Sequence, residues 1–169
     1  MDGANKPTTK RNVHILGWLI LVLALPVFVV GLFPRSYQVC PDWEVTVVDV
    51  AGAPVSGMTV RRSCQDYSVE ARNHEDDAIT DERGKASFKG RYLQWPFLVR
   101  WAGNLLNVAS QGVHASFGRH ANVWAFGREM EGVPVVNGYV EDWTGSPEHM
   151  DSRIVVKPVE VSVPHFIPR

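Results

Sequence analysis

One run constrains this chain more than any other stretch. Val13–Phe33 contains 21 residues and no Asp, Glu, Lys or Arg. As an α-helix rising about 1.5 Å per residue, the run would reach roughly 31 Å, enough to cross the hydrocarbon core of a bilayer. A helix buried in a soluble core would be shorter and would carry a polar face, which this run lacks. We therefore predict a transmembrane helix over 13–33, with Pro26 tolerated inside it.

The residues before this run predict its orientation. The tail, residues 1–12, carries Lys6, Lys10 and Arg11 against a single acid, Asp2. Positive flanks stay on the cytoplasmic side, so we expect a single-pass protein of the cell membrane with a cytoplasmic N-terminus. The C-terminal body would lie outside the cytoplasm, which means in the periplasm if the cell is Gram-negative. The alternative is a cleaved signal peptide, but its apolar region would be shorter and a small-x-small cleavage site would follow it.

The rest of the chain suits one domain. Residues 34–42 form a short linker, and residues 43–165 have the length of a single domain with its own core. After the apolar run there are 14 basic and 17 acidic residues. This balance offers no basic stripe, so nucleic acid is not an expected partner. The expected partners are the membrane, through the helix, and a protein or a component of the cell envelope.

Short apolar runs separated by turn residues follow the linker. Trp43–Asp49 alternates and is β-branched, and Gly52–Pro54 interrupts it before Val55–Arg62, which predicts a hairpin or a closely spaced strand pair. The polar stretch Ser63–Ala78 predicts an irregular loop. Further strands are predicted at Lys85–Lys89, Trp95–Trp101, Val113–Phe117, Asn122–Phe126, Val133–Val140 and Arg153–Val163. About seven short strands, with no helical periodicity beyond the apolar run, predict an all-β, Greek-key β-sandwich.

Two turns in this body carry a resemblance to a known family. The first contains Asp49, Gly52 and Pro54, and the second contains Thr80, Asp81 and Gly84. Asp81 as first residue and Gly84 as fourth fit a type I turn. With the valines around them, these turns make Trp43–Phe88 resemble the carboxypeptidase regulatory-like domain, a member of the transthyretin-like β-sandwiches. The resemblance implies the fold and a structural turn role for these six residues, but it implies no particular function.

The same fold group includes an enzyme, 5-hydroxyisourate hydrolase, which the chain resembles only in these turns. The catalytic His near the first strand and the C-terminal Tyr-Arg-Gly-Ser of that family are both missing here. Ser116, with His114 nearby, half resembles a nucleophile elbow, but no helix is expected after it. We therefore expect no catalytic residue and no enzymatic activity.

Metal-binding patterns are also missing from the sequence. His74, His114, His120 and His149 lack the spacing of zinc ligands, and no Cys pair accompanies them. The acids between 75 and 82 lack the alternation and closing Glu of an EF-hand, so a solvated loop is the preferred interpretation over calcium binding. We expect no metal ligand and no cofactor.

The two cysteines, Cys40 and Cys64, are expected to form a disulfide. An exported compartment permits the bond. If the strands on either side of Gly52 pair as a hairpin, the two cysteines would lie almost opposite each other. The alternative is two unpaired thiols.

The tryptophans do not identify the ligand. Trp43, Trp95, Trp101, Trp124 and Trp143 occupy or flank predicted strands, and most are expected in the core. A row of tryptophans on the surface would instead indicate a carbohydrate-binding face. The sequence thus predicts a membrane-anchored, non-catalytic binding or structural module. The alternatives are a cell-envelope polysaccharide-binding or adhesion domain and, less favoured, a hydrolase.

Overall fold

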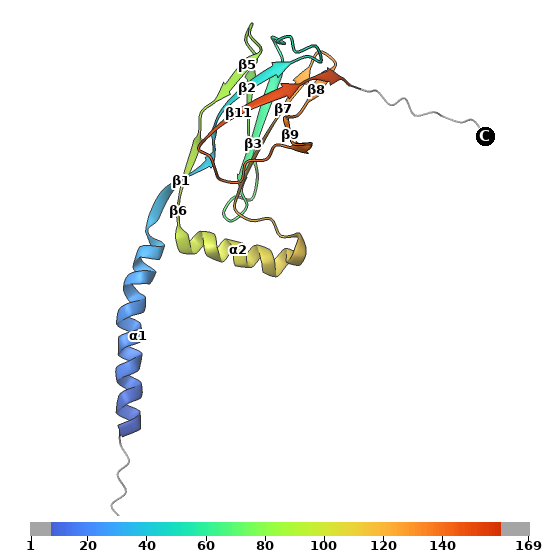
Figure 1. Ribbon diagram of the computed structural model, residues 1–169. Coiled ribbons are helices and arrows are strands. Elements are labelled where there is room, and N and C mark those ends of the chain that lie inside the picture. Colours follow the sequence, from blue (N-terminus) through green and yellow to red (C-terminus); the bar gives the residue numbers. More distant parts are fainter. Residues whose placement is uncertain (1–7, 160–169) are drawn as a thin grey trace, which may run out of the picture.

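The computed structural model describes residues 8–159, in which a long helix leads through a two-stranded ribbon into a β domain (Figure 1). Helix α1 spans Thr8–Leu32, and every side chain from Trp18 to Val30 is exposed. Over the residues whose side chains are described, no helix is both long enough and apolar enough to cross a membrane. Residues 1–7 of the predicted tail and residues 160–165 of the predicted domain lie outside the described residues.

The other elements follow α1 in chain order. They are β1 (Pro34–Cys40), β2 (Asp42–Val48), β3 (Thr59–Asp66), β4 (His74–Ile79), β5 (Lys85–Phe88), β6 (Arg91–Pro96), α2 (Phe97–Gln111), the 3-10 helix η1 (Gly112–His114), β7 (Arg119–Gly127), β8 (Met130–Gly132), β9 (Val135–Val136), β10 (Tyr139–Val140), β11 (His149–Val155) and β12 (Lys157–Pro158).

Two sheets enclose one core. The first has the strand order β11-β2-β5 and the second has the order β12-β8-β7-β3-β4. In β2, β3, β5, β7 and β11 alternate residues are buried, because side chains in a strand alternate between its two faces. Trp43 and Trp143 are the largest buried side chains, and the indole nitrogen of Trp43 donates to Ser152 Oγ at 2.8 Å. The mainly β fold that the sequence predicts is therefore present.

The predicted hairpin around Gly52 is wrong, because β2 and β3 belong to different sheets. β2 pairs antiparallel with β5 and parallel with β11, whereas β3 pairs with β4 and β7. Trp43 and Val45 of β2 and Val60 of β3 are all buried in the same core. The two strands thus face each other across the core, and the chain between them crosses from one sheet to the other.

The predicted loop Ser63–Ala78 is also wrong over most of its length. β3 continues to Asp66, and β4 begins at His74. Arg61 lies opposite Asp77 in the register of these strands, and Arg62 lies opposite Asp76. Cross-strand pairs of opposite charge stabilise a sheet, so the acidic segment forms a strand instead of a solvated loop.

Helix α2 contradicts the expectation that no helix follows the apolar run. The strand predicted at Trp95–Trp101 ends at Pro96, where the helix begins. The strand predicted at Val113–Phe117 is replaced by η1 and an irregular connection. Towards the C-terminus, Val133–Val140 holds only the short strands β9 and β10, and β11 already ends at Val155. The domain is mainly β and carries one helix along its end near α1 (Figure 1).

Candidate functional site

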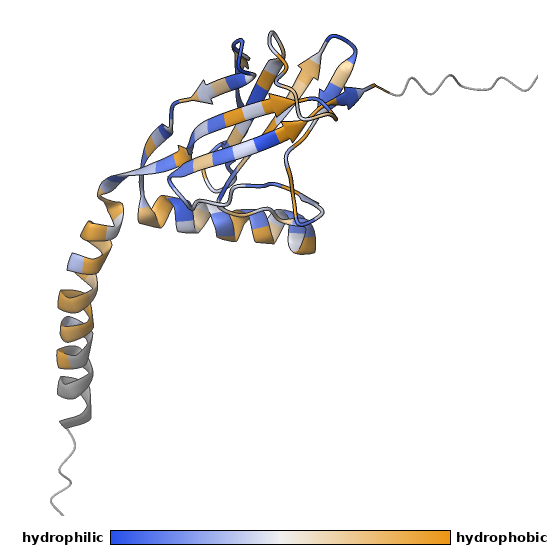
Figure 2. Ribbon diagram, turned by 45° about the horizontal axis from the view of Figure 1, so that its top comes forward, coloured by the Kyte–Doolittle hydropathy of each residue, from blue (hydrophilic) through white to orange (hydrophobic). Residues whose placement is uncertain are grey.

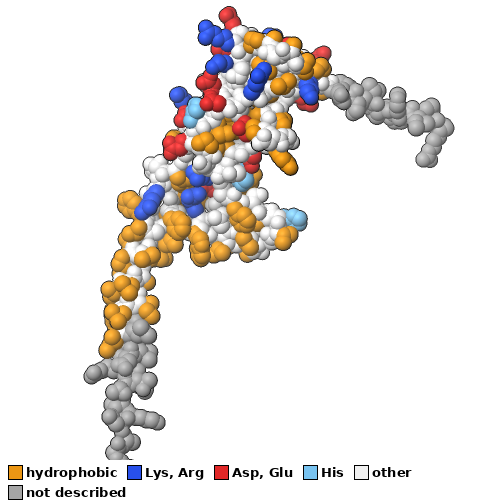
Figure 3. Space-filling model, viewed as in Figure 1, with side chains coloured by type: hydrophobic (Ala, Val, Ile, Leu, Met, Phe, Trp, Pro, Cys, Tyr) orange, Lys and Arg blue, Asp and Glu red, His pale blue; other side chains and the backbone are white. Residues whose placement is uncertain are grey.

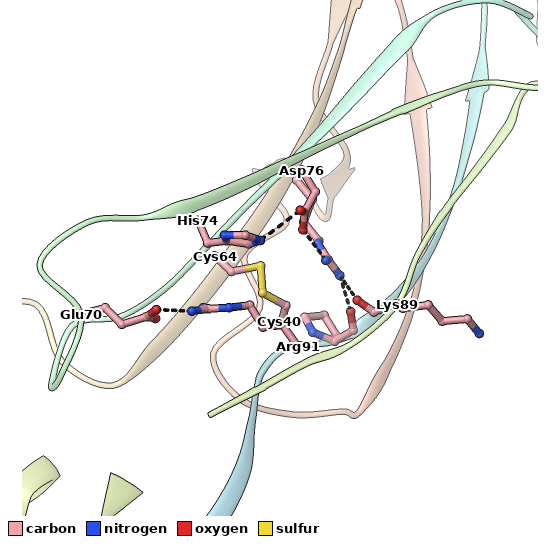
Figure 4. Close-up of polar contacts among 9 residues, drawn as sticks. Cys40, Cys64, Glu70, His74, Asp76, Lys89 and Arg91 are labelled. Atoms are coloured by element: carbon pink, nitrogen blue, oxygen red, sulfur yellow. Dashed lines mark hydrogen bonds and ion pairs between the residues drawn. A yellow bond between two sulfur atoms is a disulfide. The ribbon is translucent and has the colours of Figure 1, made fainter. Parts of the chain in front are cut away.

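The predicted disulfide is confirmed. Cys40 and Cys64 are bonded, with their Cα atoms 5.7 Å apart, and both are buried (Figure 4). The geometry differs from the predicted hairpin. Cys40 ends β1, where its register partner is Arg91, and Cys64 lies in β3 between His74 and Ala121. The bond therefore ties the ribbon of β1 and β6 to the five-stranded sheet.

A buried arginine, Arg62, lies two positions before Cys64 in β3. The guanidinium of Arg62 donates to the carbonyls of Pro41 and Lys89, each at 2.9 Å, and to Asp76 Oδ2 at 2.6 Å. Burial raises the pKa of Asp76, but its contacts with Arg62 and His74 outweigh burial and hold that pKa below its usual value. Because both terminal guanidinium nitrogens donate within the domain, Arg62 has a structural role at the seam between the sheets.

The two predicted turns are held by aspartate side chains. Asp49 Oδ1 accepts hydrogen bonds from the backbone nitrogens of Ala51 and Ala53, each at 2.9 Å. Asp81 Oδ1 accepts hydrogen bonds from the backbone nitrogens of Arg83 and Lys85, each at 2.8 Å. These backbone hydrogen bonds lower the pKa of Asp81. Both carboxylates are thereby committed to local turn structure.

The remaining turn residues join the two turns together. Gly52 and Gly84 have positive φ angles of 84° and 72°. The nitrogen of Val47 donates to the carbonyl of Gly84 at 2.8 Å, and exposed Pro54 pairs with Val48 as an isolated bridge. Thr80 Oγ1 donates to the carbonyl of Val55 at 2.8 Å and accepts from the nitrogen of Met58 at 2.9 Å. These contacts bring the six predicted turn residues together at one end of the domain.

The residues considered for catalysis do not converge. His114 ends η1, and exposed Ser116 lies in the connection to β7, so no helix follows the serine. Both ring nitrogens of His120 are engaged, with Asp142 at 3.0 Å and with the carbonyl of Phe117 at 3.1 Å. Within residues 8–159, no group of three or more His, Cys, Asp or Glu side chains could hold a metal ion.

The outer face of the five-stranded sheet carries a shallow groove, which the sequence did not predict. Its larger part, about 840 Å³, is lined among others by Arg61, Trp124, Phe126, Glu131 and Lys157. Its smaller part, about 320 Å³, is lined by Ser63, Gln65, Tyr67, Asn73, His120 and Asn122. Trp124 lines both parts, and we call them together the outer-face groove. The alternation of His120, Asn122, Trp124 and Phe126 along β7 was the sequence signal for this face.

Arg61 makes one wall of the outer-face groove rigid. Its guanidinium lies 5.5 Å from the ring centroid of Phe126 and forms a bidentate pair with Asp77 at 2.7 and 2.8 Å. Glu75 lies 3.3 Å from the same guanidinium. The hydrogen bonds from Arg61 lower the pKa of Asp77. The groove therefore combines aromatic rings and amides with the paired guanidinium of Arg61 and with the charged side chains of Glu131 and Lys157, a lining suited to a polar ligand.

The other tryptophans do not extend the outer-face groove. Trp43 and Trp143 are in the core, while Trp95 and Trp101 are exposed on β6 and α2. Trp124 alone of these five lines the groove, so the structure shows no row of exposed tryptophans along the described sheets. The edge strand β4 is rich in charge, and charged edges discourage the addition of a strand from another chain.

Comparisons with family models, with curated proteins and with solved structures found no match to this chain. The resemblance of Trp43–Phe88 to the carboxypeptidase regulatory-like domain therefore stays a prediction. The structure itself defines a disulfide-bonded, mainly β domain that follows an apolar helix and carries a groove on its outer face.

Proposed function

We propose that the chain is a single-pass membrane protein in which α1 anchors a non-catalytic β-sandwich of the carboxypeptidase regulatory-like type outside the cytoplasm. The exposure of every side chain from Trp18 to Val30 carries this proposal. A helix that is apolar on all sides needs a non-aqueous environment, and a bilayer supplies it. The uncharged run Val13–Phe33 supports the anchor, and the basic residues before it support the orientation.

The Cys40–Cys64 bond supports the placement of the β domain on the exported side of the membrane. Disulfides persist in the periplasm and outside the cell and are rare in a reducing cytosol. Both sulfurs belong to buried residues of the core, so the bond is part of the folded domain. A compartment that reduced it would remove the link between β1 and β3.

The binding surface in this proposal is the outer-face groove. It presents Trp124 and Phe126 beside the amide and hydroxyl groups of Asn122, Gln65 and Ser63. Aromatic faces bordered by amides and hydroxyls suit sugar rings, which are apolar on one face and carry hydroxyls at their edge. This lining favours a cell-envelope polysaccharide as the second, more specific candidate function.

Binding to insoluble polysaccharides tests the proposed surface. The purified full-length protein in detergent is sedimented with peptidoglycan, cellulose or chitin, and the Trp124→Ala variant is compared with Trp95→Ala. We expect at least one polysaccharide to bind the wild type and Trp124→Ala to weaken that binding about tenfold, while Trp95→Ala leaves it unchanged. Equal losses in both variants, or no binding to any polysaccharide, would contradict the glycan candidate.

A further inference from the structure

We propose that α2 is a second membrane contact: it lies flat in the interface of the bilayer, with its apolar face in the lipid and its polar face on the β domain. This proposal rests on the proposed anchoring by α1. It adds that the domain is held against the membrane at a fixed orientation instead of moving freely at the end of a tether.

The polar face of α2 points to the protein. Arg100, Gly103, Asn104 and Asn107 recur at helical spacing, so they form one stripe along the helix. Arg100 Nε lies 3.2 Å from Asp66 Oδ2, whose side chain is fully buried. Ser68 Oγ donates to Asn104 Oδ1 at 2.7 Å, and Asn107 Nδ2 donates to the carbonyl of Tyr67 at 2.6 Å. The stripe is thus bonded to the end of β3 and to the connection that follows it.

Gly103 allows this close contact. A Cβ atom at Gly103 would lie 1.8 Å from the carbonyl oxygen of Ser68. The helix backbone therefore touches the β3–β4 connection at this point. This side of α2 is fixed by the domain and is not available to another partner.

Hydrophobic and hydrophilic residues alternate along α2 (Figure 2), and hydrophobic side chains gather on the side of the helix that faces away from the β domain (Figure 3). Arg100 is the only charged residue in the helix, and none of its residues is buried. The exposed large side chains are Phe97, Val99, Trp101, Leu105, Leu106 and Val108. A helix on a soluble domain normally buries its apolar face and exposes its polar face, and α2 does the reverse. An apolar face with Trp, Phe and Leu is typical of helices that lie in a membrane interface.

The ribbon places α2 at the level where α1 would leave the bilayer. Pro34 and Pro96 are register partners at the end of the β1–β6 ribbon. α1 ends at Leu32, two residues before Pro34, and α2 begins directly after Pro96. The two helices therefore start from one point, and α2 runs across the direction of α1 (Figure 1). With α1 along the membrane normal, α2 would lie along the membrane surface.

The apolar surfaces of the two helices are continuous. A Cβ atom at Gly31 would lie 2.8 Å from Leu98 Cγ, so the helices are in contact at this point. Next to that contact, towards the N-terminus of α1, an open apolar pocket of about 530 Å³ lies between the two helices. This wedge-shaped pocket is lined by Leu98 of α2 and by α1 residues between Ile20 and Phe28. Lipid chains around α1 would fill this wedge. A second protein copy would have to enter it from within the bilayer, which favours lipid as the occupant.

The test measures how deep each position lies in the lipid. The full-length protein is placed in nanodiscs at one copy per disc, and single cysteines are introduced and labelled with an environment-sensitive fluorophore. Both native cysteines are bonded, so the introduced thiol is the free one. Leu106→Cys reports on α2, Leu23→Cys reports on α1, and Val50→Cys, in the turn after β2, is the exposed control. The quenchers are lipids brominated at shallow or deep acyl positions.

We expect shallow brominated lipid to reduce the fluorescence at Leu106→Cys by about half and to leave Val50→Cys unchanged, because interfacial helices insert roughly 5–10 Å. Deep brominated lipid is expected to quench Leu23→Cys. Quenching at Leu23→Cys without quenching at Leu106→Cys would overturn the α2 proposal and leave the anchor intact. No quenching at Leu23→Cys would refute the anchor. A further sample holds two copies per disc. If the fluorophore at Leu106→Cys enters an apolar environment only in that sample, the apolar face of α2 binds a second copy, and the proposed lipid contact is overturned.

Discussion

Pro34 and Pro96 lie opposite each other at the end of the β1–β6 ribbon, so α1 ends and α2 begins at neighbouring points of the chain's fold. Proline cannot continue a ladder of backbone hydrogen bonds, and it is well tolerated at the start of a helix. The pair therefore ends the ribbon and begins the helical part of the molecule. It also fixes α2 beside α1, on which the proposed arrangement at the membrane depends.

Gly103→Ala is expected to loosen α2 from the domain. In an isolated helix this change would stabilise by about 1 kcal/mol, because Ala has the higher helix propensity. Here the new Cβ would meet the carbonyl oxygen of Ser68 at 1.8 Å, so the helix has to move away. Hydrogen exchange of the α2 amides should become faster. Ser110→Ala, at an exposed position of the same helix, should leave exchange unchanged or slow it, and faster exchange in both variants would contradict the contact.

The Cys40–Cys64 bond is expected to contribute about 3 kcal/mol to the free energy of unfolding. The two residues are 24 positions apart, and closing a loop of that length restricts the unfolded chain. Urea unfolding of the purified protein, followed by tryptophan fluorescence, should show a lower midpoint in Cys64→Ser than in the wild type. Reductant should lower the wild-type midpoint and leave the variant unaffected. Equal midpoints for both proteins without reductant would contradict this role.

Gly84→Ala is expected to destabilise the domain more than Gly138→Ala. Both glycines have positive φ angles, 72° and 85°, so Ala is strained at either position by roughly 1–2 kcal/mol. A Cβ at Gly84 would also lie 2.5 Å from the carbonyl oxygen of Val47, whereas nothing lies within 4 Å of one at Gly138. Urea midpoints of the two variants measure the difference. Similar midpoints would show that the turn at Gly84 has room to adjust.

The stability of the domain is expected to fall in acid. The pKa values of Asp76 and Asp81 lie below the ordinary value of 3.8, so both contribute stability above that pH. This stability is lost as the pH falls through their lower folded-state pKa values. Urea midpoints should therefore decline below about pH 4. Asp76→Asn, which leaves Arg62 without its carboxylate, should be less stable at neutral pH and should decline less in acid. If the urea midpoint of Asp76→Asn declines in acid as steeply as that of the wild type, Asp76 is excluded as a source of the acid-sensitive stability.

The sequence predicted those features that depend on local pattern. Alternation in Trp43–Val48 and the turn residues Asp81 and Gly84 indicated strands and a turn, and the structure has them there. The disulfide was predicted correctly for a wrong reason, since the bond joins the β1–β6 ribbon to β3 of the five-stranded sheet and does not lie along a hairpin. Strand pairing depends on contacts between distant residues, which a local pattern does not contain.

The helix α2 was missed because its apolar residues were interpreted as a strand. Trp95, Phe97, Val99 and Trp101 alternate, and this alternation outweighed the helical spacing of Arg100, Gly103, Asn104 and Asn107. That polar stripe was the available signal. The strand β4 was missed because the arginines that pair with its acids lie in β3, and their register is set by the tertiary fold.

Labelling of Val50→Cys in intact cells with a membrane-impermeant maleimide, followed by isolation of the membrane fraction, tests the anchor and its orientation together. Val50 is exposed, whereas the native Cys40 and Cys64 are bonded and buried, so the introduced thiol is the one that reports. We expect the protein to remain in the membrane fraction and Val50→Cys to react without permeabilisation. Reaction of Val50→Cys only after the cells are permeabilised would place the domain in the cytoplasm and contradict the proposed orientation and compartment.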